Sequence, residues 1–259
     1  MAVFDKKSIK GAIGNVSFST RGNLTVARIK PGKGGVKQTS ATKKSAALFG
    51  RAVSPFAKVL RMAFSNSYRS FYDRAMVNRM NSAVSTILYQ HVNEEGHFTF
   101  KPESFQRIEG FNFNELSPLN RSLLVNLVCE IKGDEAVIKL PELNVKKDLK
   151  FPRGAMDCIL TIQVAQFNLE TGCQKIYETE KVNISKKQSG NPEYSFNYPL
   201  PKGSLSLASV AIEYFGSPGN LLINDKNFHP AGIFSAAYLP GKASDAELEE
   251  WEVMQVKLD

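Results

Sequence analysis

The sequence lacks the features that most directly reveal where a protein works. No stretch of about 18 apolar residues is present that could span a membrane, and the start of the chain has no apolar run of signal-peptide length. The 259 residues contain only three cysteines, with no CxxC pair. An odd and sparse set of cysteines fits a reducing compartment better than a disulfide framework. We therefore expect a soluble cytoplasmic protein without membrane partners, or a virion component if a phage encodes it.

Signatures of catalysis and metal binding are missing as well. The three histidines, His91, His97 and His229, have no spacing typical of metal ligands, and His91 and His97 are expected at the surface. No GxSxG or HExxH motif occurs, and the paired glutamates fall in expected turns, on a polar strand face and in the C-terminal tail. The region of Asp225 and Asn227 is interpreted as a turn, since the glycine and the terminal glutamate of an EF-hand loop are absent. We expect no enzyme activity, no cofactor and no metal.

Acidic residues are almost absent from the first third of the chain. Residues 1–80 carry sixteen Lys/Arg but only two acids, Asp5 and Asp73. The whole chain is +8, so this region carries +14 and the remaining 179 residues carry −6. A basic region of this kind typically meets nucleic acid, an anionic membrane surface or an acidic protein face. The segregation of the charge indicates an interaction surface rather than lysines scattered for solubility.

Two short β-prone runs lie at the start of this basic region. Residues 12–20 and Leu24–Ile29 flank turn residues around Gly22, which predicts a hairpin. We expect a flexible lead over residues 1–10 and a bend or bulge at Gly14. An isolated hairpin is marginally stable in water, so this one is expected to dock on its own helices, on a neighbour or on another chain.

A strap rich in glycine and lysine, residues 31–40, follows the hairpin. It has no acid and lacks the GxxxxGK[ST] spacing of a nucleotide-binding loop. Its backbone N–H groups and lysines suit phosphates, and a plain linker is the alternative that stays open. Because the strap has no aromatic residue, we expect phosphate or shape contacts rather than base stacking. The candidate nucleic-acid-binding residues are Arg21, Arg28, Lys30, Lys33, Lys37, Lys43, Lys44 and Arg51.

The next segment, residues 41–92, is predicted to contain two helices. Ser40 or Thr42 is expected to cap the first turn, and Ser54 followed by proline is expected to open the helix again. A second amphipathic pattern runs over residues 69–90. The two apolar faces should pack together and leave the arginines outward.

Residues 93–259 have the pattern of many short strands divided by turn signals. Strands are expected at residues 97–100, 104–113, 122–131, 135–140, 156–168, 174–182, 194–200, 206–215 and 232–239. Such a series without intervening helices predicts an antiparallel immunoglobulin-like sandwich, either one elaborated sandwich or two small ones. The acidic tail is predicted to form a short helix or an edge strand. The predicted fold class is α+β, with a basic arm with a hairpin over 1–40, two helices over 41–92 and the sandwich region after them.

A set of motifs also occurs in a recognisable order along the chain. The set consists of Gly11, Gly14, Asn15 and Val16, then Arg21-Gly22, Arg28-Ile29-Lys30-Pro31, the strand AMDCILTIQVAQFNLETG, and Ser235-Ala236-Ala237-Tyr238-Leu239-Pro240-Gly241. In this order the chain resembles a Bacteroidota family of unknown function, which implies a glycine-rich basic hairpin, a helical segment and a C-terminal β-sandwich. Phe18 stands near the family's aromatic position, the Gln-Arg of its helix is absent, and residues 242–259 extend past its usual end. The resemblance implies no active site, because the family has none assigned.

Two functions from different classes follow from these patterns. The first is a non-enzymatic binding protein that is anchored through its basic arm to RNA, DNA or a nucleoprotein assembly. The second is a structural subunit of a phage virion or injection-type assembly, whose arm docks on neighbouring subunits and buries the open edge of the hairpin. The expected partner is therefore nucleic acid or an acidic protein surface, and a homo-oligomer or larger assembly stays open.

Overall fold

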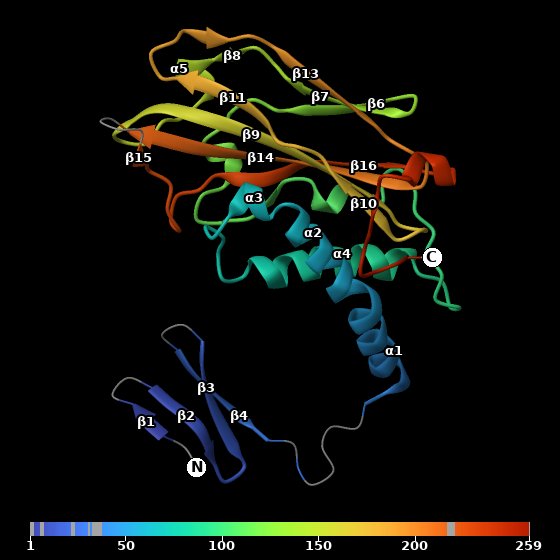
Figure 1. The fold of residues 1–259 in the computed structure, drawn as a ribbon. Coiled ribbons are helices and arrows are strands. Elements are labelled where there is room, and N and C mark those ends of the chain that lie inside the picture. Colours follow the sequence, from blue (N-terminus) through green and yellow to red (C-terminus); the bar gives the residue numbers. More distant parts are fainter. Residues whose placement is uncertain are drawn as a thin grey trace. The chain divides into compact units, whose positions relative to one another are not determined.

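The computed structural model describes residues 3–5, 8–21, 24–30, 32, 38–216 and 221–258. The chain divides into two compact units, Met1–Ala47 and Leu48–Asp259, which we call the N-terminal unit and the C-terminal unit and describe separately. Helices and antiparallel sheets make up the structure, so the predicted α+β class is confirmed (Figure 1).

The N-terminal unit contains a four-stranded antiparallel sheet in the order β1-β2-β3-β4. Its strands are β1 (Val3–Asp5), β2 (Ser8–Ile13), β3 (Val16–Arg21) and β4 (Leu24–Ile29). The bounds of β4 match the prediction, but strands stand where a flexible lead was expected. Gly14 is not a bulge: it has a φ of 55° and lies in a two-residue turn between the paired residues Ile13 and Val16. Glycine adopts this left-handed conformation without steric cost, as tight hairpins require.

Helix α1 (Ser40–Leu48) follows the strap. The hydroxyl oxygen of Thr39 accepts a hydrogen bond from the Thr42 N–H at 3.2 Å, which satisfies one of the free donors at the start of the helix. The residue that caps the helix is therefore Thr39, one position before Ser40, because its hydroxyl is the group that the Thr42 N–H reaches.

The C-terminal unit begins with a helical run that does not stop at Ser54. A π-helical turn, η1 (Phe49–Val53), leads directly into α2 (Ser54–Ala63), and the Ser54 N–H donates to the Phe49 carbonyl. Ser54 has helical backbone angles and caps nothing, contrary to the expectation. Pro55 has no N–H to donate to the carbonyl of the preceding turn, and the wider π turn allows the chain to continue past it.

The second predicted helix is shorter than the sequence pattern suggested. A single turn, α3 (Ser65–Tyr68), precedes it, and α4 spans Met76–His91 rather than starting at residue 69. Arg69 has a φ of 48°, which interrupts the helical path. The Asp73 carboxylate then accepts the Ala75 N–H at 2.7 Å, a local turn that competes with helix formation.

An eight-stranded antiparallel sheet, with strands of very different lengths, forms the centre of the C-terminal unit. Its main order is β17-β10-β9-β14-β16-β5, with β11 also paired to β9 and β15 to β14. The strands are β5 (Phe111–Asn112), β9 (Ala155–Asn168), β10 (Cys173–Ile176), β11 (Glu180–Ser185), β14 (Ser204–Gly216), β15 (Leu221–Leu222), β16 (Ala231–Leu239) and β17 (Glu252–Val253).

A second, three-stranded sheet has the order β13-β7-β6. The remaining elements are short and lie in connecting segments. Their bounds, with those of the second sheet, are β6 (Val128–Lys132), β7 (Glu135–Leu140), β8 (Leu143–Asn144), β12 (Gly190–Asn191), β13 (Tyr194–Pro199), α5 (Val145–Asp148), η2 (Gln106–Ile108), η3 (Leu119–Arg121) and η4 (Asp245–Leu248).

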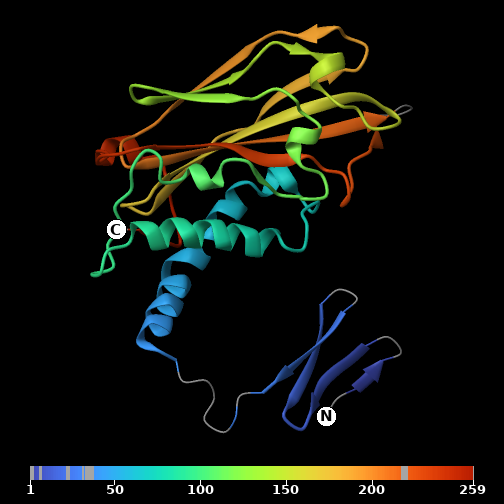
Figure 2. The ribbon, with the colours of Figure 1, turned by 180° about the vertical axis from the view of Figure 1, so that it is seen from behind.

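The large sheet is covered on both faces. Alternate residues of β9 point to opposite sides: Leu160 and Ile162 pack in one core with side chains of the small sheet, such as Ile138. Phe167 belongs to the other core, which includes Phe56 of α2. Figures 1 and 2 show the resulting three layers, with the small sheet on one face of the large sheet and α2, α3 and α4 on the other.

Three predicted strands are largely replaced by other structure. Residues 97–100 form only a single bridge, between Val92 and Phe98, and residues 104–113 form a 3₁₀ turn followed by β5. In 122–131 only the end, β6, is a strand, although Leu123 and the alternate residues after it gave a clear period of two. The acidic tail forms both predicted kinds of element, the 3₁₀ turn η4 and the edge strand β17.

Truncation on either face of β9 should destabilise the whole C-terminal unit. We expect Phe167→Ala to lower the free energy of unfolding by about 3–5 kcal/mol and Ile162→Ala by about 2–5 kcal/mol, because each leaves a cavity in a close-packed core. Urea unfolding followed by circular dichroism measures both. Ile176→Ala, at a side chain that is 41% exposed, is the control and should change stability by about 0.5 kcal/mol or less. If one of the two core variants matched the control, that layer would not be packed as described.

Candidate nucleic-acid interface

Four of the candidate cationic residues are exposed in the described part of the N-terminal unit. Arg28 lies in β4 and Lys30 directly follows this strand, while Lys43 and Lys44 lie in the first turns of α1. Residues two apart in a strand share a face, so Arg28 and Lys30 project to the same side. Among the described residues none of the four forms an ion pair. These cations are therefore available to an external anion.

Of these four, Lys30 has one weak internal contact, a hydrogen bond from its Nζ to the Gly14 carbonyl at 3.4 Å. The other four candidates are not part of this group. The side chain of Arg21 and the whole of Lys33 and Lys37 lie outside the described residues. Arg51 belongs to η1 in the C-terminal unit, where its Nη2 donates to the Gly96 carbonyl at 2.9 Å. The structure thus places Arg28 near Lys30 at the end of β4 and Lys43 next to Lys44 in α1, and it places Arg51 in the other unit.

The two units differ strongly in net charge. Residues 1–47 contain ten Lys/Arg and one acid, Asp5, whereas residues 48–259 contain 23 Lys/Arg and 24 acids. The N-terminal unit therefore carries +9 and the C-terminal unit −1. The remaining +5 of the basic region lies in residues 48–80, which belong to the C-terminal unit.

Several cations of the helical segment are held by partners within the C-terminal unit. Arg69 forms an ion pair with Glu213 at 2.7 Å. Arg79 forms ion pairs with Asp73 and with Glu115. Three others donate hydrogen bonds to neutral acceptors: Arg51 to Gly96, Lys58 to Gln255 and Arg61 to Asn81. The ion pairs neutralise Arg69 and Arg79, whereas the hydrogen bonds orient the other three side chains without neutralising their charge.

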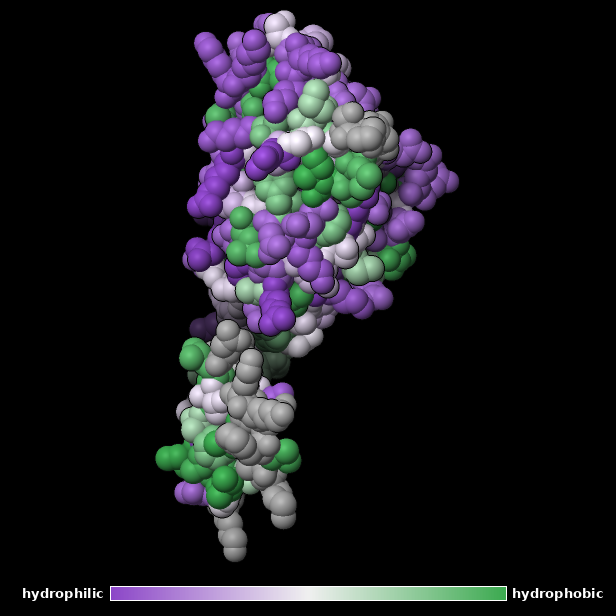
Figure 3. Space-filling model, turned by 90° about the vertical axis from the view of Figure 1, so that its left-hand side faces the viewer, coloured by the Kyte–Doolittle hydropathy of each residue, from purple (hydrophilic) through white to green (hydrophobic). Residues whose placement is uncertain are grey.

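The N-terminal unit has no buried core of its own among the described residues. Each residue before Leu48 whose burial the structure describes is half-buried or exposed, including four large apolar side chains. These are Val3 (66% exposed), Ile13 (61%), Leu24 (71%) and Ile29 (76%). Figure 3 shows apolar side chains, in green, on the surface of this unit. A small sheet without a buried core of its own is marginal in water.

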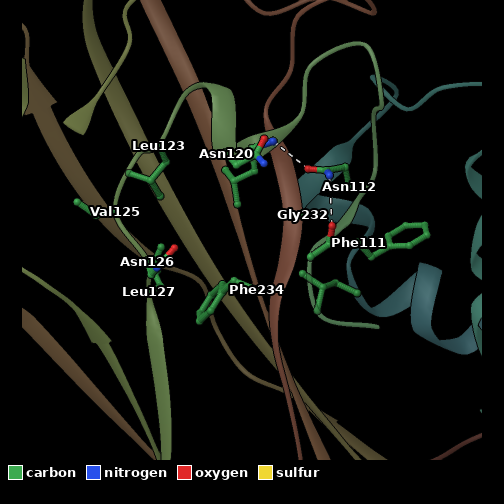
Figure 4. A pocket seen from close by; sticks show the side chains of 12 residues that line it. Phe111, Asn112, Asn120, Leu123, Val125, Asn126, Leu127, Gly232 and Phe234 are labelled. Atoms are coloured by element: carbon green, nitrogen blue, oxygen red, sulfur yellow. Dashed lines mark hydrogen bonds between the residues drawn. The ribbon is translucent and has the colours of Figure 1, made fainter. Parts of the chain in front are cut away.

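The C-terminal unit contains a neutral cleft of about 280 Å³. Leu123, Val125 and Leu127 line one side of it, and Phe111 and Asn112 line another (Figure 4). The period of two in this stretch, from which a strand was predicted, thus marks the wall of a cleft. None of its lining residues has a titratable side chain, so the lining itself offers no acid, base or nucleophile.

Burial makes two of the three cysteine thiols unreactive. Burial raises the pKa of the Cys158 thiol to about 12 and raises the pKa of Cys129 as well, so both stay protonated at neutral pH and are poor nucleophiles. The described residues hold no group of three or more His, Cys, Asp or Glu side chains placed to bind a metal ion.

His229 is a buried structural residue. It is 1% exposed, and its Nε2 lies 2.8 Å from the Ser67 carbonyl while its Nδ1 lies 2.9 Å from the Asn224 side-chain nitrogen. Asn224 also bonds the backbone of Ile212 and Tyr214 in β14. The neighbouring Asp225 forms the predicted turn. No sequence signal distinguished His229, because its partners lie 5 and 162 residues away.

Comparisons with known proteins assign no family. No protein-family model matches the chain, and no curated protein matches it. Within the described residues no helix combines the length and the apolar character needed to cross a membrane. Charge, burial and geometry therefore carry the proposals that follow.

Acidification should weaken the protein through His229. Burial lowers the pKa of its imidazole, so the unfolded chain takes up this proton first as the pH falls. Stability is complete above the unfolded pKa of about 6.5 and declines below it. We expect His229→Gln to cost about 1–3 kcal/mol at pH 7.5, because buried polar partners lose their bonds, and to flatten the pH dependence between about pH 7 and 5. Urea unfolding across this range, with the exposed His97→Gln as control, measures both effects; an unchanged pH slope in His229→Gln would contradict this role.

Proposed function

We propose that this protein is a non-enzymatic binding protein that contacts the phosphate backbone of RNA or DNA through its N-terminal unit. The observation that carries the proposal is the charge of +9 within residues 1–47, together with Arg28, Lys30, Lys43 and Lys44, which are exposed and form no ion pair among the described residues. Cations of this kind neutralise phosphates and release counterions, with little preference for base sequence.

The physical character of the surface supports backbone contact over base recognition. The strap over residues 31–40 contains no aromatic side chain, so it offers no platform on which bases stack. Arg28 and Lys30 lie roughly 6.6 Å apart along one face of β4 and its continuation, which suits two separate phosphate contacts. The C-terminal unit, with a charge near zero, acts as the body that is carried to the nucleic acid.

Two further assignments are part of this proposal. The two packed sheets of the C-terminal unit form an immunoglobulin-like sandwich, which its antiparallel strands and its shared core support. The chain is related to the Bacteroidota family that its motifs resemble, and it works in the cytoplasm, or in a virion if a phage encodes it.

A second candidate function is assembly: the N-terminal unit docks on a neighbouring subunit of a virion or injection-type structure. The specific observation in its favour is the exposure of large apolar side chains on a sheet without a buried core, with Leu24 and Ile29 more than 70% exposed. Phosphates do not cover such side chains, whereas a protein partner does.

Removal of strap and strand charges tests the nucleic-acid proposal. We expect the triple variant Lys30→Gln, Lys33→Gln and Lys37→Gln to bind duplex DNA or structured RNA more weakly, because phosphate contacts are lost. Each lost contact should also lower the slope of log K against log[salt] by about 0.9 for B-DNA. Fluorescence anisotropy of a labelled duplex at several salt concentrations gives the slope.

The matched control removes three exposed lysines from the C-terminal unit, as Lys146→Gln, Lys147→Gln and Lys150→Gln. This variant has the same total charge as the test variant and should keep the slope of the unaltered protein. Equal losses in the two triple variants would mean that total charge alone governs binding. Binding that does not depend on salt, or no binding at all, would refute the nucleic-acid proposal and favour assembly.

A further inference from the structure

We infer that the free edge of β4 pairs with β4 of a second copy of this chain, which joins the two N-terminal sheets into one continuous antiparallel sheet. The inference rests on the second candidate function and deepens it, because it names the partner and the residues through which assembly occurs. The two edges of the N-terminal sheet differ in a way that points to β4.

The first edge strand, β1, covers only Val3–Asp5, and a very short edge is one of the ways in which proteins prevent unwanted pairing. The other edge strand, β4, has six residues, Leu24–Ile29. It pairs with β3 on one side and with no described strand on the other. It contains neither proline nor a bulge, and a single charge, Arg28. It is therefore an open template for a further strand.

The hydrogen-bond pattern of β4 shows which groups face this free edge. The Lys30 N–H donates to the Asn15 carbonyl, and Ser17 lies opposite Arg28. Hydrogen-bonded and non-bonded pairs alternate along an antiparallel ladder, so the backbone groups of the even-numbered residues face β3. The N–H and C=O groups of Thr25, Ala27 and Ile29 then face outward. None of these three N–H groups has a partner among the described residues.

This outward row is complementary to itself. A two-fold axis perpendicular to the sheet leaves every side chain on its own face, and near the middle of β4 it passes through Val26 or through Ala27. An axis at Ala27 places Thr25 opposite Ile29 of the second copy, Ala27 opposite Ala27, and Ile29 opposite Thr25. All three outward residues then exchange backbone hydrogen bonds. An axis at Val26 would use only Thr25 and Ala27.

The side chains fit the same register. On one face Thr25 meets Ile29, a pair of β-branched residues that suits cross-strand packing, and Ile29 is 76% exposed in the single chain. On the other face Arg28 lies opposite Val26, and Lys30 lies opposite Leu24. No cation directly opposes another cation in this arrangement, so the pairing avoids the closest like-charge contacts.

The charge of +9 on each N-terminal unit opposes the approach of two copies over longer distances. Salt screens this repulsion, with a Debye length of about 8 Å at physiological ionic strength. The dimer should therefore become tighter as salt rises. Phosphate binding has the opposite salt dependence, so the two activities of the N-terminal unit are separable by one titration.

Light scattering of the nuclease-treated full-length protein tests the pairing, over a wide range of protein and salt concentrations. We expect a dimer that is strengthened by salt. Ala27→Pro should yield a monomer, because it removes an outward N–H while the bonds from β4 to β3 remain. Ala27→Ser, which keeps the donor and the small side chain, should still form the dimer. Unchanged far-ultraviolet circular dichroism confirms that Ala27→Pro retains its sheets.

A cysteine cross-link tests the register without removing any hydrogen bond. Hydrogen-bonded antiparallel partners have Cα atoms about 5.5 Å apart, within the range that a disulfide spans, so Ala27→Cys should form a covalent dimer under mild oxidation. Val26→Cys and the unaltered chain, with its free Cys129, Cys158 and Cys173, should not. Cross-linking through Val26→Cys instead would overturn the register.

The remaining outcomes separate this inference from the function on which it rests. If the protein self-associates, but Ala27→Pro changes nothing and Ala27→Cys does not cross-link, the β4 edge is not the interface and assembly through another surface stands. If the protein is monomeric at every concentration and proteases digest residues 1–47 freely, both the edge pairing and assembly through the N-terminal unit are overturned.

Discussion

The pairing of β9 with β14 is the constraint on which the C-terminal unit depends. These two strands, of 14 and 13 residues, run antiparallel from Ser204 opposite Asn168 to Gly216 opposite Ala155. Both faces of this ladder are covered, by the helices on one side and by the small sheet on the other. A shift of one residue in the register would exchange the two sets of side chains between the two cores. The remaining strands and helices can therefore pack in only one arrangement around it.

The elements that were predictable from the sequence are those that a local pattern of residues determines. The bounds of β4 and β7 match the prediction, because each is an alternating segment between turn residues. The predicted helix over 69–90 was too long because the apolar period continued through Phe71, whose ring instead contacts His229. Likewise, alternation from Leu123 onward reflects a cleft wall and not a strand. Periodicity reports which side of a segment is apolar, but the partner that covers it comes from tertiary structure.

The candidate site shows the same division between what is local and what is not. The excess of cations in the first eighty residues is visible in the sequence, since counting charges requires no fold. Which of these cations are free is not visible, because Arg69 finds Glu213 and Arg51 finds Gly96 only after folding. These contacts engage cations of the helical segment, whereas Arg28, Lys30, Lys43 and Lys44 of the N-terminal unit form no ion pair among the described residues. The sequence also gave no indication of the buried contact between His229 and Ser67, which ties β14 and the loop after it to α3.

Charge and hydrogen bonding act in opposite directions on the same small sheet. Repulsion between units of +9 holds two β4 edges apart, while unpaired N–H and C=O groups and exposed side chains such as Ile29 favour bringing them together. Under the two proposals made above, a polyanion bound to Arg28 and Lys30 would neutralise part of this repulsion and leave the outward backbone groups of Thr25, Ala27 and Ile29 free. Binding of the anion and pairing of the edges would then be thermodynamically linked, so that each strengthens the other. The two candidate functions would in that case be steps of one process, in which nucleic acid promotes assembly of the protein that binds it.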